Sequence, residues 1–99
     1  MQSKQKLKPN QLDLFRRRMK FSQGYVAHLL GHKDTSACSD YERGTRLPSL
    51  VNALRLSIIL RVPVEFLFYA LHDDLRATIR AEEERLVAEG CKPIQQALF

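Results

Sequence analysis

Residues 22–48 read SQGYVAHLLGHKDTSACSDYERGTRLP, and this stretch predicts two short helices joined by a tight turn. Ser22 is a suitable N-terminal cap for the first of these helices, which spans residues 23–30. One face of that helix is apolar at helical spacing, with Val26, Ala27 and Leu30. Gly31 is expected to end it, because glycine adopts a positive φ without strain.

The second predicted helix begins after a cap at Asp34 or Thr35 and ends at Arg43 or Gly44. Its inward positions are Ala37, Cys38 and Tyr41. Its outward positions carry short polar side chains, namely Thr35, Ser36, Ser39 and Asp40. A helix that is polar but weakly charged on its outer face suits direct contact with base edges, so the pair is interpreted as a DNA-binding helix-turn-helix.

Helical spacing also predicts a first helix over residues 11–19, capped by Asn10. Ser49 caps a fourth helix that runs to about Leu60 and is apolar nearly all round, so we expect it to be covered on more than one side. Pro63 is expected at the first position of a short fifth helix. A sixth helix is predicted from His72 to Glu89, with one apolar stripe on a charged surface.

These elements predict an all-α fold, a compact five-helix domain with an additional C-terminal amphipathic helix. The expected divisions are a flexible basic arm (1–9), the helix-turn-helix domain (10–70), the C-terminal helix (71–90) and a tail (91–99). The C-terminal helix either packs on its own domain or pairs with a second copy, and both possibilities stay open. The arm either makes no contact or follows DNA phosphates or a minor groove.

Composition narrows the class of protein further. The 99 residues are 44% apolar and 27% charged, which fits one folded domain. Arg55 and Arg61 interrupt the longest apolar stretch, and the basic N-terminus lacks the apolar run of a signal peptide, so a cytoplasmic, nucleoid-associated protein is expected. No paired nucleophile and base, carboxylate pair or glycine-rich phosphate loop stands at a useful spacing, which argues against an enzyme.

The two cysteines and three histidines do not indicate a cofactor or metal. Cys38 is expected to be a small buried hydrophobe and Cys91 an exposed tail thiol, in preference to a disulfide between them. The histidines, His28, His32 and His72, do not combine with the cysteines at a zinc-binding spacing.

Charge is distributed unevenly along the chain. Residues 1–46 hold ten Lys and Arg against four acids, while the remaining residues hold six against seven, so the formal charge of +5 comes from the first half. A polyanionic partner would therefore meet the half that contains the two-helix element. A basic surface that only aids solubility is the alternative explanation.

The run SQGYVAHLLGHKDTSACSDYERGTRLPSL resembles the helix-turn-helix of the lambda-repressor, Cro and Xre-like group of bacterial and phage regulators. The matching positions are Ser22-Gln23, Val26-Ala27, Leu30-Gly31, Tyr41-Glu42-Arg43-Gly44 and Arg46-Leu47-Pro48-Ser49-Leu50. The likeness covers about residues 10–70. It implies that Gln23 contacts a phosphate and braces the DNA-reading helix, and that Glu42 is a buried acid paired with Arg16 as a structural element.

Two features depart from that group. One extra residue lies between Gly31 and Glu42, which places Cys38 at a core position where isoleucine is usual. Asp40 stands where a basic residue is common. Since a carboxylate is repelled by phosphate, Asp40 either accepts from a cytosine amino group, pairs with a neighbouring arginine or faces away from DNA.

The resulting hypothesis is a transcriptional regulator, expected to be a repressor, that binds duplex operator DNA as a homodimer with residues 34–43 in the major groove. The expected DNA-binding residues are Gln23, Lys33, Asp34, Thr35, Ser36, Ser39, Asp40, Arg43, Thr45 and Arg46. The alternative is an antitoxin or adaptor whose main partner is another protein, held through the C-terminal helix or tail.

Overall fold

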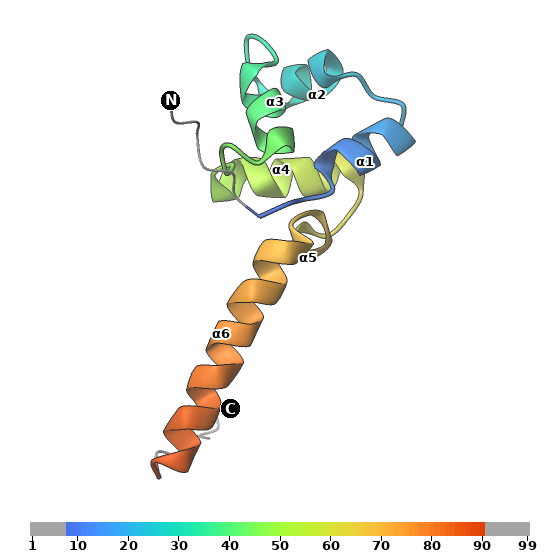
Figure 1. The fold of residues 1–99 in the computed structure, drawn as a ribbon. Coiled ribbons are helices and arrows are strands. Elements are labelled where there is room, and N and C mark those ends of the chain that lie inside the picture. The colour runs from blue at the N-terminus through green and yellow to red at the C-terminus, as the bar shows by residue number, and fades with distance from the viewer. Residues whose placement is uncertain (1–7, 91–99) are drawn as a thin grey trace, which may run out of the picture.

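The computed structural model describes residues 8–90, which fold into helices joined by short turns (Figure 1). The elements in that range are α1 (Leu12–Arg18), α2 (Gln23–Leu30), α3 (Ser36–Arg43), α4 (Leu50–Leu60), α5 (Val64–Leu67) and α6 (Tyr69–Ala88). The predicted all-α class, with a five-helix domain and one further C-terminal helix, is confirmed. Residues 1–7 of the expected arm (1–9) and the tail with Cys91 lie outside the described residues.

Local capping chemistry sets most of the helix ends. The Ser22 Oγ accepts a hydrogen bond from the Tyr25 backbone N–H at 3.0 Å, and the Ser49 Oγ accepts one from the Asn52 N–H at 3.1 Å. Gly31 ends α2 with a φ of +80°, in the left-handed region that glycine tolerates. These three predicted boundaries of α2 and α4 are therefore confirmed.

Three other boundaries differ from the predicted ones by a few residues. Gln11 takes the cap position of α1, although the Asn10 Oδ1 still accepts from the Leu12 N–H at 2.9 Å. Pro63 takes the cap position of α5 and not its first helical position. The last helix starts at Tyr69 and not at His72, because Phe68 is the single non-helical residue between α5 and α6.

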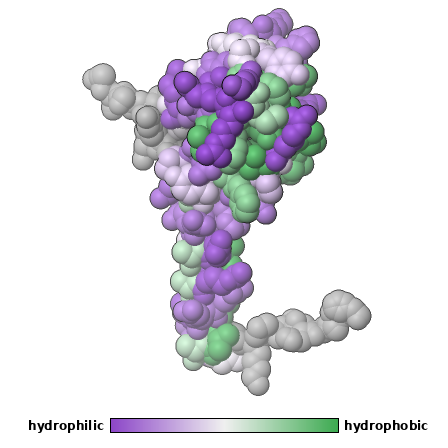
Figure 2. Space-filling model, turned by 90° about the vertical axis from the view of Figure 1, so that its right-hand side faces the viewer, coloured by the Kyte–Doolittle hydropathy of each residue, from purple (hydrophilic) through white to green (hydrophobic). Residues whose placement is uncertain are grey.

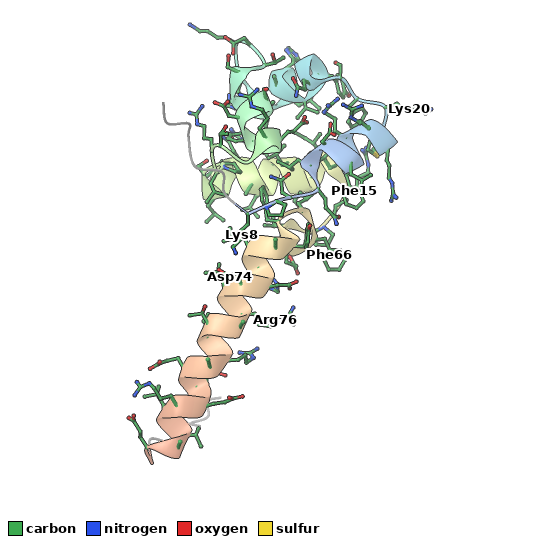
Figure 3. All side chains as sticks on the ribbon, viewed as in Figure 1. Lys8, Phe15, Lys20, Phe66, Asp74 and Arg76 are labelled. Atoms are coloured by element: carbon green, nitrogen blue, oxygen red, sulfur yellow. The ribbon has the colours of Figure 1, made fainter. Side chains whose placement is uncertain are left out.

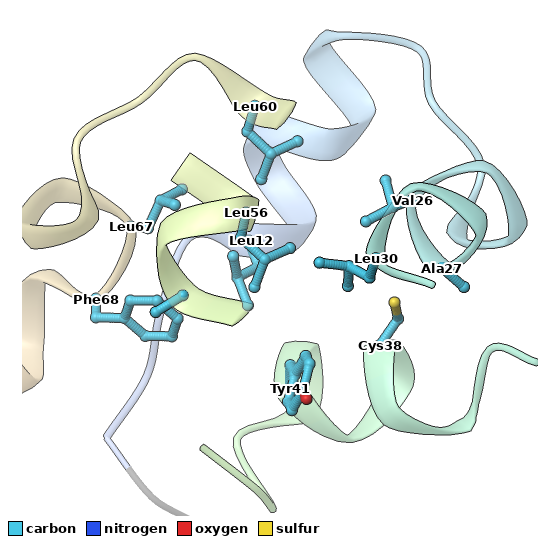
Figure 4. Close-up of a cluster of buried hydrophobic side chains, with 11 residues drawn as sticks. Leu12, Val26, Ala27, Leu30, Cys38, Tyr41, Leu56, Leu60, Leu67 and Phe68 are labelled. Carbon is cyan, nitrogen blue, oxygen red and sulfur yellow. The ribbon is translucent and has the colours of Figure 1, made fainter. Parts of the chain in front are cut away.

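One hydrophobic core joins α1 to α5 (Figure 4). Leu67 of α5 is the most completely buried of its side chains, with no exposed surface. The buried side chains are Leu12, Val26, Ala27, Leu30, Cys38, Tyr41, Ala53, Leu56, Leu60, Leu67 and Phe68. Each fully buried large apolar side chain contributes about 1.5–3 kcal/mol, so this cluster holds α2 and α3 at a fixed mutual angle.

The expectation that α4 is covered on more than one side is wrong. Ala53, Leu56 and Leu60 face the core, but the opposite face is exposed, at 73% for Leu50 and 75% for Ile58. The reason is that α2 and α5 both pack on the inner side of α4, whereas α6 points away from the domain (Figure 1).

The last helix, α6, projects from the domain as a stalk (Figure 1). Every residue from His72 to Gly90 is exposed, and only Ala70 and Leu71 at its start are partly covered. Near its base, the Lys8 Nζ lies 3.9 Å from the Asp74 carboxylate (Figure 3). In the described residues, then, α6 does not cover its own domain. None of the helices in residues 8–90 combines the length and the apolar character that crossing a membrane requires.

Cys38 points into the core between α2 and α3 (Figure 4). Its exposed fraction is 3%, and it borders a cavity of about 10 Å³ among the buried side chains. Burial raises the pKa of the Cys38 thiol, because removal from water disfavours the charged thiolate. The predicted role as a small buried hydrophobe fits this position.

Because the thiolate is the reactive form, we expect Cys38 to react with a thiol reagent at least about tenfold more slowly than an unfolded cysteine at pH 8. The measurement uses a Cys91→Ser variant, so that a single thiol is followed. Denaturant should restore the full rate, since unfolding returns the thiol pKa to its ordinary value. Fast labelling of the native protein would contradict the burial.

Candidate nucleic-acid interface

The network that fixes α3 relative to α1 centres on Arg16. Its Nε donates to the Glu42 Oε2 at 2.5 Å and its Nη2 donates to the Glu42 Oε1 at 3.2 Å. The remaining donors reach the Phe21 carbonyl at 2.9 Å and the Asp13 carboxylate at 2.9 Å. Both members of the Arg16–Glu42 pair have side chains that are only 12% exposed, and the hydrogen bond to Glu42 raises the pKa of Arg16. A guanidinium with this many partners acts as a rigid joint between two helices.

Gln23 joins the same network from the start of α2. Its Nε2 donates to the Glu42 Oε1 at 2.8 Å, so one carboxylate binds side chains from both α1 and α2. This contact sets the direction of the first turn of α2, where the backbone N–H groups point outward without helical partners. The position therefore allows a brace to α3 and a contact to an anion at the same helix end.

On the outer face of α3, one arginine is held by two neighbours. The Arg43 Nη2 donates to the Asp40 carboxylate at 2.6 Å, and the Arg43 Nη1 donates to the Ser39 Oγ at 2.7 Å. Arg43 remains 59% exposed, whereas the Asp40 side chain is 22% exposed. Of the three arrangements open for Asp40, the structure contains the pairing with a neighbouring arginine.

At the start of α3, one polar residue caps the helix and two others present their hydroxyls at the surface. The Asp34 Oδ1 accepts from the Ser36 backbone N–H at 2.9 Å, and this bond lowers the pKa of Asp34. Thr35 occupies the cap position without a side-chain cap bond, so Asp34 supplies the cap. Ser36 is exposed and Thr35 is partly exposed, and their hydroxyls lie at the outward end of the helix.

The turns on either side of α3 carry cations and one threonine. Lys33 is exposed in the turn that leads into the helix, and Arg46 is exposed in the loop that follows it. The Arg46 guanidinium lies 6.0 Å from the centre of the Tyr41 ring, which orients it over α3. Thr45 closes the end of α3, because its backbone N–H and its hydroxyl both donate to the Asp40 carbonyl, at 3.0 Å and 3.3 Å.

Two asparagines support this surface and were not predicted to do so. The Asn10 Nδ2 donates to the Tyr41 carbonyl at 2.9 Å, and the Asn52 Nδ2 donates to the Tyr41 hydroxyl at 3.4 Å. Together they tie the second half of α3 to the starts of α1 and α4. The available signal in the sequence was Tyr41 itself, because a buried tyrosine hydroxyl needs a hydrogen-bond partner.

The arrangement matches a known family. The family model described as Helix-turn-helix matches residues 12–67, which runs from the start of α1 to the end of α5. A comparison with curated proteins gave no match. Since the matched segment is more than half of the chain and contains α3, the Gln23 brace and every residue of the buried core except Phe68, this chain belongs to the lambda-repressor/Cro (Xre-like) family of helix-turn-helix proteins.

Proposed function

We propose that the chain is a sequence-specific transcriptional regulator that binds duplex DNA with α3 in the major groove. The observation that carries this proposal is the outer face of α3, where Arg43 is oriented by Ser39 and Asp40 while the inner face is buried. A guanidinium fixed before binding loses less freedom when it meets a base edge. Arginine is also the side chain that most often recognises guanine in the major groove.

Contacts to base edges and contacts to phosphates come from different residues in this proposal. Arg43, Ser39, Ser36 and Thr35 lie along the outward side of α3 and meet bases. Lys33, Arg46 and the first turn of α2 at Gln23 meet phosphates on either side. Asp34 and Thr45 shape the two ends of α3 through their backbone bonds, and Asp40 acts on DNA only through Arg43.

The test is the salt dependence of binding to an operator selected from a pool of random duplexes. If about five phosphates are neutralised in each half-site, log Kd changes with log salt with a slope of about 4 to 5 per half-site. Arg46→Ala should reduce that slope by about one, because it removes one phosphate contact. Affinity that does not change with salt, or a pool from which no duplex is enriched, would rule out this function.

We also propose that the protein acts as a homodimer on paired half-sites and represses transcription by occupying its operator. The support is the apolar surface that the described residues leave exposed on α4 and α6. Sedimentation at micromolar concentration measures the oligomeric state, and footprinting measures the half-site spacing. A monomer that protects a single half-site would contradict this part of the proposal without affecting DNA binding itself.

A second candidate function is an antitoxin or adaptor that binds another protein. The observation in its favour is α6, which projects from the domain with exposed apolar residues. The two candidates differ in what Arg43→Ala with Arg46→Ala does. It abolishes the activity of a DNA-binding regulator in the cell, whereas an adaptor that works through α6 retains its activity.

A further inference from the structure

An apolar stripe runs along α6 and is uncovered in the described structure. Leu75 is 51% exposed, Ile79 is 54% exposed and Leu86 is 37% exposed. At helical spacing these residues share one face with His72 and Glu82. Figure 2 shows hydrophobic and hydrophilic side chains side by side along this projecting helix. A single helix with such a face is marginal in water and is stabilised when the face is buried.

The stripe continues into a groove at the base of α6. The groove has a volume of about 540 Å³ and lies between α6, α5 and the chain around the start of α4. Its apolar lining includes Leu47, Pro48, Val64, Phe68, Leu71 and Leu75. Since Leu75 belongs to both the groove and the stripe, a helix laid along the stripe would enter the groove with one of its ends.

We propose that the occupant is α6 of a second copy, packed antiparallel, with the two-fold axis crossing the apolar stripe midway between Leu75 and Ile79. In this register, Leu75 packs against the partner's Ile79, and Leu86 enters the partner's groove over Phe68. This interface describes how the two copies of the proposed homodimer would meet, and it therefore rests on that part of the proposed function. The groove around Leu47 and the stripe that ends at Leu86 together form one continuous surface for self-association.

Charge complementarity selects this register. Glu82 is the acidic residue that interrupts the stripe, and the antiparallel register places it opposite the partner's His72, whose ring N–H can donate to the carboxylate. Because the axis relates the two chains, the contact forms twice. The charged groups near His72 include Asp73, with its carboxylate 3.7 Å from the imidazole, Arg76, which donates to the same carboxylate at 3.4 Å, and Glu65 across the groove.

The parallel arrangement opposes like charges instead. Glu82 would lie opposite the partner's Glu82 inside the apolar seam. Residues 81–90 hold four glutamates and one arginine, a formal charge of −3, and a parallel pair would place two such segments together. The antiparallel pair sets this segment beside residues 69–80, where two aspartates balance two arginines, and it also opposes the two helix dipoles.

Disulfide trapping tests the register directly. Leu75→Cys and Ile79→Cys proteins, each also carrying Cys91→Ser, are mixed in equal amounts and mildly oxidised. We expect the mixed disulfide to exceed either like-with-like disulfide by about tenfold. Like residues are offset by about 6 Å along the helix, and this offset adds to the sideways distance between the two helices, so their Cα atoms lie beyond the roughly 7 Å that a disulfide spans. Ala77→Cys, on the opposite face of α6, is the control and should not cross-link.

Two other outcomes of the trapping experiment, and two outcomes of dimerisation measured by sedimentation on other variants, would overturn the proposal. Predominant like-with-like disulfides would show a parallel pair, and yields equal to those of Ala77→Cys would show that α6 does not meet α6. Loss of the dimer on Ile58→Glu would instead place the interface on the exposed face of α4. Dimer formation only after Leu98→Asp with Phe99→Asp would show that the tail fills the groove.

Charge reversal gives an independent readout by sedimentation. Glu82→Lys should weaken dimerisation by about tenfold, because it removes the carboxylate that accepts from the partner's His72, and adding His72→Glu should restore it, because the new ammonium group at position 82 then faces a carboxylate. Glu84→Lys makes the same charge change on the far side of α6 and should leave the dimer unchanged. No rescue by His72→Glu would refute the register. Operator binding by the same variants separates the two proposals: salt-dependent, specific binding by a monomer leaves the DNA-binding function intact while this interface fails.

Discussion

Glu42→Ala is expected to lower the free energy of unfolding by about 2–4 kcal/mol, because it leaves the Arg16 guanidinium largely buried without its main partner. For a domain of this size, that loss lowers the melting temperature by roughly 10–25 °C. Thermal unfolding followed by far-ultraviolet circular dichroism measures it. The effect should be this large because Glu42 also binds Gln23, so one substitution releases both α1 and α2 from α3.

Arg17→Ala is the matched control for that prediction. Arg17 is the next residue of α1 and also forms an ion pair, with Asp13 at 2.7 Å, but its side chain is 72% exposed. Solvent screens such a pair, so its loss should change stability by no more than about 0.5–1 kcal/mol. Equal melting temperatures for Glu42→Ala and Arg17→Ala would show that the Arg16–Glu42 pair does not hold the two helices together.

Arg43→Ala is expected to weaken binding to the selected operator by about 10-fold to 100-fold in each half-site, while binding to unrelated duplexes falls much less. The reason is that Arg43 is the long side chain on the outer face of α3 that is oriented before binding. Asp40→Asn should give part of the same loss, because the orienting carboxylate becomes a neutral amide. Fluorescence anisotropy at a fixed salt concentration measures both variants.

Arg80→Ala removes the same side chain from α6 and serves as the control, since Arg80 is 62% exposed and lies away from α3. It should leave the operator affinity within about twofold of the unchanged protein. If Arg43→Ala leaves the ratio of affinities for the selected operator and for unrelated duplexes unchanged, α3 does not select the sequence through this residue. The melting temperature of Arg43→Ala should stay unchanged, because the contacts of Arg43 are confined to the surface.

Local chemistry explains which parts of the fold could be predicted from the sequence. Ser22, Gly31 and Ser49 act on backbone groups within three or four residues, so their helix ends follow from neighbouring residues alone. The core face of α2 also follows from periodicity, because an eight-residue helix with a single apolar stripe must bury that stripe in the core. The family resemblance was confirmed by the match over residues 12–67.

The placement of α4 and α6 depended on long-range packing and was not predictable in the same way. An apolar stripe shows that a face can be buried but does not identify what buries it, so the sequence left open whether α6 covers α4. The structure separates the two helices, which leaves Leu50 and Ile58 exposed. The third partner of Arg16, the Phe21 carbonyl, was similarly hidden, because no side-chain pattern marks a backbone acceptor.

The outer face of α3 has a consequence for how this protein can change over evolution. Its hydrogen bonds at Ser39, Asp40 and Arg43 connect side chains within α3 and add none of the bonds that join α3 to α1, α2 or α4. Residues 36, 39 and 43 can therefore be replaced while the scaffold keeps its stability. The same separation makes the domain suitable for redesign of its DNA preference. Variants at these three positions should differ in the operator that they bind and should stay folded.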